Sequence, residues 1–103
     1  MLDVRRATSL PARLRGLLGT AHWPRGRALL IRPCSSVHTA FMRYAIDVVF
    51  IDRRGQVLRI AAALRPWRMA SAWGAVAVLE LAAGEAQRLG WSVGDVLPRS
   101  VWA

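Results

Sequence analysis

Two apolar runs joined by a short polar turn constrain the fold of this chain more than any other feature. Residues 46–51 read IDVVFI, residues 56–62 read QVLRIAA, and DRRG lies between them at 52–55. Gly55 supplies the positive φ that a short hairpin connection needs. The segment 46–62 is therefore predicted to form a β-hairpin, so that a sheet is the expected framework of the protein.

Weaker patterns indicate the remaining elements. Further strands are predicted for the apolar runs at 28–31, 37–42 and 76–81, with a loop at 65–74 and a last strand beginning at Val96. The predicted fold class is α+β: a small, mainly antiparallel β-sheet tending to a barrel, with two short helices. At this length the chain, residues 1–103, is expected to form a single domain.

Both predicted helices are short and end at glycine. Leucines spaced as on one face of a helix predict the first over about residues 9–18, followed by Gly19 as a C-terminal stop. The second is predicted between Gly84 and Gly90, with Glu85 in its first turn, where a carboxylate interacts favourably with the helix dipole.

The charge is strongly basic, because fifteen arginines and no lysine stand against six acidic residues, a net charge of +9. Such an excess attracts polyanions non-specifically, whether or not binding them is the function. An ordinary protein with an arginine-rich surface is the alternative. No apolar stretch approaches the roughly 20 residues of a membrane-spanning helix. With no leader pattern and one cysteine, a cytoplasmic protein that does not bind membranes is expected.

A thiol, an imidazole and a carboxylate lie close together in the sequence, at Cys34, His38 and Asp47. Asp47 interrupts an apolar strand, where a buried charge is costly unless it is paired or hydrogen-bonded. Arg43, His38 and backbone amides are its candidate partners. We predict a binding module for a small polar ligand or a protein partner, with Cys34, His38, Arg43, Asp47 and Glu80 as its site. The structural alternative is a satisfied carboxylate and a packed histidine beside an inert thiol.

An enzyme is the third functional hypothesis. A Cys and His pair can activate a nucleophile when a third group orients the imidazole. The short spacing of Cys34 and His38 is weak evidence, because catalytic Cys and His are usually distant in sequence. No metal or other cofactor is expected. The chain has one cysteine and two histidines, so a zinc site would have to use Cys34, His38 and Asp47 for the three protein ligands of a catalytic site, and the nucleotide-binding motifs are absent. The sequence therefore favours a binding protein over an enzyme and assigns no catalytic residue.

Nucleic-acid binding is the second hypothesis. The sequence RPWR at 65–68 places a tryptophan between arginines, a composition suited to stacking on bases and contacting phosphates. The predicted nucleic-acid-binding residues are Arg13, Arg15, Arg65, Trp67 and Arg68. For Trp67, a role in the core remains equally open. The tryptophans at 23, 73 and 91 are predicted to be core residues whose indole N–H groups find carbonyls.

The order of the motifs resembles a known family. The motifs are RGLLG at 15–19, PCSSVHTAFMRYAIDVVFID at 33–52, LRPWR at 64–68 and LELAAGEAQRLGWSVGD at 79–95. In this order they resemble the short bacterial and archaeal proteins grouped as domain of unknown function 192, over about Ala7 to Leu97. Phe41, Met42 and Asp47 match the central block of the family pattern. The resemblance implies a compact, strand-rich α+β domain, and it implies no activity and no catalytic residue.

Overall fold

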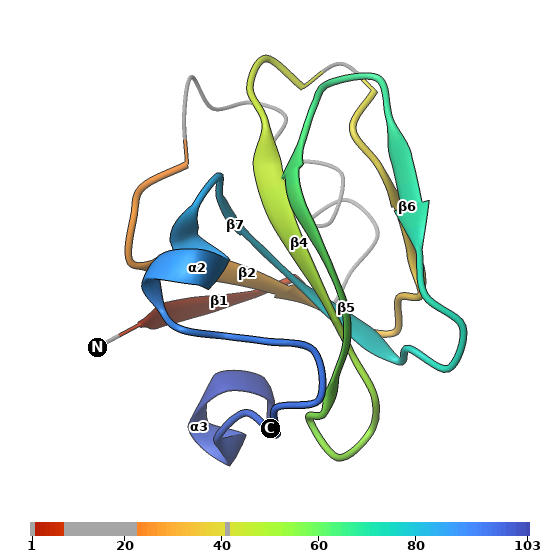
Figure 1. Cartoon of the computed structure of the whole chain (residues 1–103), viewed down its shortest axis with the longest axis vertical. Coiled ribbons are helices and arrows are strands. Elements are labelled where there is room, and N and C mark those ends of the chain that lie inside the picture. The colour runs from red at the N-terminus through yellow and green to blue at the C-terminus, as the bar shows by residue number, and fades with distance from the viewer. Residues whose placement is uncertain (1, 8–22, 41) are drawn as a thin grey trace.

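The computed structural model of this chain describes residues 2–7, 23–40 and 42–103. Figure 1 shows the elements in this part of the chain. The strands and helices are β1 (Asp3–Ala7), β2 (Arg27–Ile31), β3 (Ser36–His38), β4 (Ile46–Ile51), β5 (Val57–Leu64), β6 (Met69–Ser71), β7 (Ala77–Ala82), α2 (Glu85–Arg88) and α3 (Arg99–Trp102).

Five strands form one sheet in the order β1-β2-β7-β4-β5, and β3 pairs with β6 in a separate two-stranded sheet. All pairs are antiparallel except β1 with β2. The expectation of a mainly antiparallel α+β fold is confirmed. Within the described residues the large sheet ends at β1 on one side and β5 on the other, so the predicted tendency toward a barrel is not confirmed.

The predicted hairpin is present as β4 and β5. Val49 lies opposite Ile60, and Ile51 lies opposite Val57. Gly55 has φ of 81°, and its N–H donates to the Asp52 carbonyl at 3.0 Å. Its backbone conformation is the one that the sequence required, because L residues with a side chain rarely adopt positive φ.

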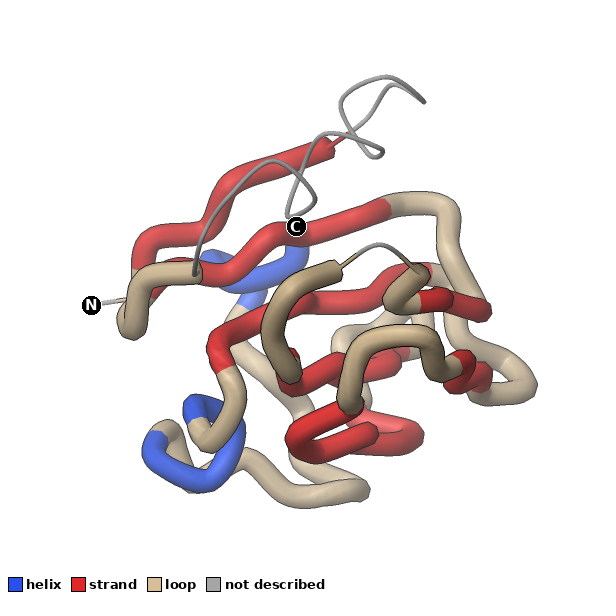
Figure 2. The backbone as a smooth tube through the Cα atoms, turned by 90° about the horizontal axis from the view of Figure 1, so that it is seen from above, coloured by secondary structure: helices blue, strands red, loops and turns tan. Residues whose placement is uncertain are grey.

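Each face of the large sheet carries its own apolar cluster, because side chains alternate along a strand. Ile46, Val48 and Phe50 pack on one face with Val37 of β3 and Ala70 of β6. The other face is covered by the C-terminal segment, and its members include Val49, Ile51, Leu79, Ala86, Val101 and Trp102. The two helices and the β3–β6 pair accordingly lie on different sides of the large sheet (Figures 1 and 2).

Three elements differ from the predictions. β1 was not predicted, because DVRRA has no apolar run; a parallel edge strand that pairs on one side only does not need one. β6 lies inside the predicted loop 65–74. The predicted last strand is wrong, since Val96 forms only an isolated bridge to Gln56 and Pro98 then begins α3.

Of the two predicted helices, the second is confirmed as α2, which follows Gly84 at φ of 90°. The first, over about 9–18, lies outside the described residues. None of the helices in the described ranges is long and apolar enough to cross a membrane.

We predict that Gly55→Ala destabilises the protein more than Gly26→Ala. Both glycines have φ of 81°, so both substitutions carry the left-handed penalty of roughly 1–2 kcal/mol. A Cβ at position 55 would lie 2.1 Å from Nε1 of Trp102, whereas a Cβ at position 26 meets nothing within 4 Å. Displacing Trp102 should add about 1–3 kcal/mol to the loss, as overpacking does. Urea unfolding of both variants measures the difference, and equal losses would contradict the prediction.

Candidate functional site

Asp47 is buried inside the sheet, with 1% of its surface exposed. Its carboxylate accepts two backbone hydrogen bonds: Oδ1 from the N–H of Ala63 at 2.8 Å, and Oδ2 from the N–H of Ala86 at 2.9 Å. Each oxygen therefore has its own donor. These charge-assisted hydrogen bonds from backbone N–H groups offset the cost of burying the carboxylate.

Both donors exist because the backbone is irregular where they lie. The β4–β5 register shifts between Ile46 and Val48, which leaves an extra residue in β5, and Ala63 has φ of 49°. A bulge of this kind leaves an N–H without a ladder partner. Ala86 lies in the first turn of α2, where N–H groups have no partner within the helix. Asp47 thus accepts hydrogen bonds from two backbone N–H groups, in β5 and α2, that have no acceptor within the sheet or the helix.

The structure does not bring the other predicted site residues to Asp47. His38 is exposed on β3, and Arg43 is exposed in the segment before β4. Cys34 packs against the cluster on the opposite face of the sheet from Asp47, and its Sγ donates to the Ser36 carbonyl at 3.3 Å. The predicted partners of Asp47 are therefore wrong except for the backbone amides, and the five residues do not form one site.

Glu80 also faces away from Asp47. Its neighbours across the sheet are Leu29 of β2 and Val48 of β4, both members of the apolar cluster on the β3–β6 side. Burial alone raises the pKa of the Glu80 carboxyl to about 7, because no interaction with a described residue offsets the loss of water. Asp47 and Glu80 are thus two acids on opposite faces of one sheet: the first accepts two backbone hydrogen bonds, and the pKa of the second is raised by loss of water.

Cys34 lines a shallow hollow of about 440 Å³ at the start of β3. The hollow is lined by Pro33, Cys34, Ser35, Ser36, Ala75 and Val76. Within the described ranges, no group of three His, Cys, Asp or Glu side chains is placed to hold a metal ion.

The segment 65–68, which we call the RPWR loop, is hydrogen-bonded to Thr39. Thr39 is 1% exposed, and its hydroxyl donates to the Arg65 carbonyl at 2.6 Å and accepts from the Arg68 N–H at 2.9 Å. The backbone contributes further hydrogen bonds, from the Thr39 N–H to the Arg68 carbonyl and from the Trp67 N–H to the Thr39 carbonyl. The loop is therefore held in one shape by a buried residue.

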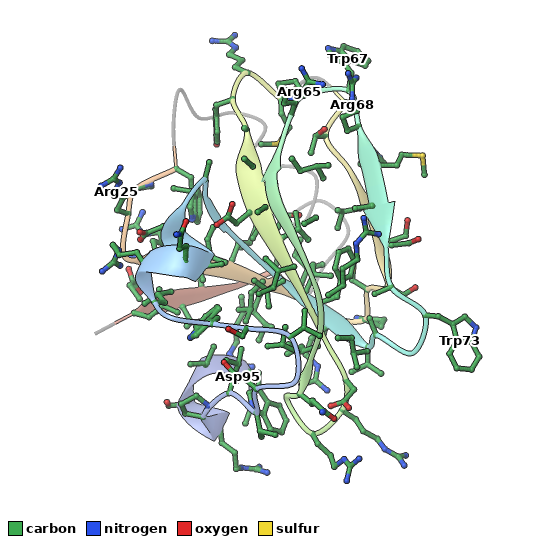
Figure 3. The ribbon with its side chains drawn as sticks, viewed as in Figure 1. Arg25, Arg65, Trp67, Arg68, Trp73 and Asp95 are labelled. Atoms are coloured by element: carbon green, nitrogen blue, oxygen red, sulfur yellow. The ribbon has the colours of Figure 1, made fainter. Side chains whose placement is uncertain are left out.

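Trp67 stands at the tip of that loop with 61% of its surface exposed, so the possibility of a core role for it is wrong. Its φ is 63°, which is unusual for a bulky side chain and costs of order 1–3 kcal/mol. Figure 3 shows Arg65, Trp67 and Arg68 together at one end of the molecule. Of the other predicted nucleic-acid-binding residues, Arg13 and Arg15 lie outside the described residues.

The ion pairs of the described residues lie away from the RPWR loop. Asp3 pairs with Arg5 and Arg27, and Glu85 pairs with Arg88, which holds the pKa of Glu85 below its ordinary value. These are the ion pairs between described residues, and none involves the RPWR loop. The Arg68 guanidinium instead donates to the Trp67 carbonyl at 3.3 Å.

Trp73 corrects the prediction that it belongs to the core. It is 100% exposed in the turn after β6 and projects into solvent (Figure 3). Trp23 is buried as predicted, and its Nε1 donates to the Arg27 carbonyl at 2.9 Å. Trp91 is half-buried against the cluster that contains α3. The composition of residues 69–74 alone did not distinguish an exposed tryptophan from a buried one.

Thr39 is the residue that the sequence analysis missed. Its signal was weak, because a threonine in an apolar run ordinarily indicates a strand position. Its function depends on main-chain groups 26 to 29 positions further along the chain, and no local pattern identifies them.

We predict that Asp47→Asn costs about 1–3 kcal/mol of stability, the penalty for a buried donor without an acceptor. Asparagine has one acceptor oxygen, whereas Asp47 uses both of its oxygens. Asp52→Asn is the matched control, because a single oxygen of Asp52 accepts from both Arg54 and Gln56 and the amide can keep both bonds. Chemical denaturation measures the two losses, and a loss for Asp52→Asn as large as that for Asp47→Asn would refute this assignment.

Glu80 should make stability fall as pH rises. Its pKa of about 7 in the folded protein lies above the ordinary value of 4.5, so the folded state keeps a proton that the unfolded chain releases. The stabilisation is complete below pH 4.5 and is lost as pH approaches and passes 7. Glu80→Gln should remove this part of the slope. Denaturation curves across that window measure it, and parallel profiles for the two proteins would count against a shifted carboxyl.

Two solved structures share this fold. A protein of unknown function from Novosphingobium aromaticivorans DSM 12444 superposes with a TM-score of 0.81 at 24% identity, over 92% of this chain and 73% of its own. A protein from Sinorhizobium meliloti 1021, described as a "putative transcription regulator", superposes with a TM-score of 0.83 at 25% identity, over 94% of this chain and 81% of its own.

No curated protein matches the chain. The sequence pattern of the family DUF192, described as Uncharacterized ACR, matches residues 1–98. The match spans nearly the whole chain and agrees with the motif order noted in the sequence. The protein belongs to the domain of unknown function 192 family.

Proposed function

We propose that this protein binds single-stranded nucleic acid through the RPWR loop. The observation that carries the proposal is the exposed, strained Trp67 held between two arginines by a buried threonine. A loop whose main chain is already fixed presents its aromatic ring to a base without losing much backbone entropy on binding. Backbone strain of this kind is retained where the surrounding contacts enforce it.

The roles of the three side chains follow from their chemistry. The indole of Trp67 stacks on an unpaired base, an interaction of about 1–3 kcal/mol that tolerates any sequence. Arg65 and Arg68 contact the phosphates on either side and release condensed counterions. A base in a duplex is already stacked on both faces, so the loop favours single strands over double strands.

Electrostatics supports the same ligand. The net charge is +9, and the acids of the described residues are buried or lie away from the loop. A polyanion is therefore attracted to the whole molecule and finds an arginine-flanked aromatic ring at this end. The structural relative described as a transcription regulator is consistent with contact with nucleic acid.

The first prediction from this proposal concerns Trp67. Trp67→Ala should weaken binding of a fluorescent single strand of about twelve thymidines, within the usual site size, by roughly 5- to 150-fold in an anisotropy titration. Trp67→Gly should weaken it equally while unfolding at no lower urea concentration than Trp67→Ala, because glycine relieves the positive φ. Unchanged affinity in both variants would eliminate the stacking role.

A pair of double variants separates the loop from bulk charge. Arg65→Ala with Arg68→Ala, and Arg53→Ala with Arg54→Ala, remove the same charge from opposite ends of the β4–β5 hairpin. In the same titration at several salt concentrations, the loop variant should lower the slope of log affinity against log salt by about 1.4, and the control by much less. Equal effects would show that only the overall charge matters.

A further inference from the structure

We infer that the nucleic-acid site extends beyond the RPWR loop, across the outer face of the β3–β6 sheet, to Trp73. This inference rests on the proposed function and adds a second stacking residue and a minimum ligand length. Trp67 precedes β6 and Trp73 follows it, so the two exposed indoles stand at the two ends of the same strand (Figure 3). We call the surface between them the β6 track.

Side chains along β6 alternate between exposed and buried positions, and the exposed ones define the β6 track. Met69 is 74% exposed and Ser71 is exposed, while Ala70 between them is buried. Opposite them on β3, His38 pairs with Met69 and Ser36 pairs with Ser71, and both are exposed. Because paired residues on adjacent strands point to the same face, these four side chains form one outward surface.

The chemistry of the track suits a nucleic-acid strand. Residues 32–40 and 65–76, which form β3, β6 and their flanking loops, contain no Asp or Glu. Nη1 of Arg59 donates to the Ser71 carbonyl at 2.7 Å, which brings another guanidinium beside the track. Serine hydroxyls and an imidazole provide hydrogen-bonding groups for phosphates and base edges between the two indoles.

The Trp73 end also offers space for a base or sugar. The shallow hollow of about 440 Å³ is lined partly by Ala75 and Val76, which follow the turn that carries Trp73, and by Ser36 at the start of β3. Backbone hydrogen bonds from the Ala72 N–H to Ser35 and from the Cys34 N–H to Val76 hold its two walls together.

The spacing of the indoles sets the minimum length of the ligand. The six residue-to-residue steps from position 67 to position 73, at about 3.3 Å each, span up to roughly 20 Å. A mononucleotide cannot contact both rings across this distance, whereas a strand of several nucleotides can. Site sizes of about 4–16 nucleotides are usual for small single-strand-binding domains.

An anionic membrane is the other polyanion that exposed tryptophan and arginine could contact. A membrane-binding surface presents a continuous apolar face. The track instead has a single exposed apolar side chain, Met69, beside Ser36, His38 and Ser71 between its aromatic ends. This mostly polar surface therefore favours a nucleic-acid strand over a membrane.

The experiment is a length series. Wild type, Trp67→Ala, Trp73→Ala and Val93→Ala are titrated with fluorescent thymidine oligonucleotides from about 3 to 16 nucleotides, and with vesicles containing phosphatidylserine. Trp73→Ala should leave the shortest strands unaffected and should weaken the longer ones by roughly 5- to 150-fold. Trp73→Phe should recover much of the loss. Val93→Ala, which alters an exposed apolar residue elsewhere, should have no effect.

The outcomes distinguish the two proposals. If Trp67→Ala weakens binding and Trp73→Ala does not at any length, the loop function stands and the track is refuted. If neither substitution changes affinity, both proposals fail. If Trp73→Ala reduces vesicle binding but not oligonucleotide binding, the track is a membrane contact and this inference is overturned. Trp73 is fully exposed, so circular dichroism should show an intact fold in its variants.

Discussion

The two hydrogen bonds accepted by Asp47 are the interaction on which the rest of the structure depends. A carboxylate in β4, an inner and wholly buried strand, is tolerated because each oxygen has a backbone donor. One donor lies in the bulge of β5 and the other in the first turn of α2. The same side chain therefore fixes where β5 bends and where the C-terminal segment lies against the sheet.

Asp47 has a structural role, and it lies apart from the RPWR loop that we propose to be functional. The bulge at Ala63 directly precedes Leu64 and the RPWR loop, so the bend that Asp47 stabilises also sets the direction in which the chain leaves β5. Thr39 then fixes the loop from the other side. Two buried polar residues, each hydrogen-bonded to main-chain groups, thus position the loop that carries an exposed aromatic residue.

Sequence reasoning recovered the β4–β5 hairpin, the strands β2, β3 and β7, and α2, because their signals are local: apolar runs, and glycines at positive φ. It failed at β1, β6 and α3, which are short or polar and are held in place by partners distant in sequence. For the site, it singled out the acid and the RPWR loop, and their function stays a prediction. It grouped Cys34, His38 and Asp47 wrongly, because closeness in sequence does not determine which face of a sheet a side chain occupies.

The sequence by itself indicated that Asp47 needed a partner, because an ionised carboxylate buried among aliphatic side chains is costly unless it is paired or hydrogen-bonded. Only the tertiary structure decided that the partners are main-chain amides 16 and 39 positions away. It likewise decided that Trp73 faces solvent while Trp23 is buried. The physical reason is the same in each case. Burial and hydrogen bonding depend on which distant segments pack together, and local sequence patterns do not determine that packing.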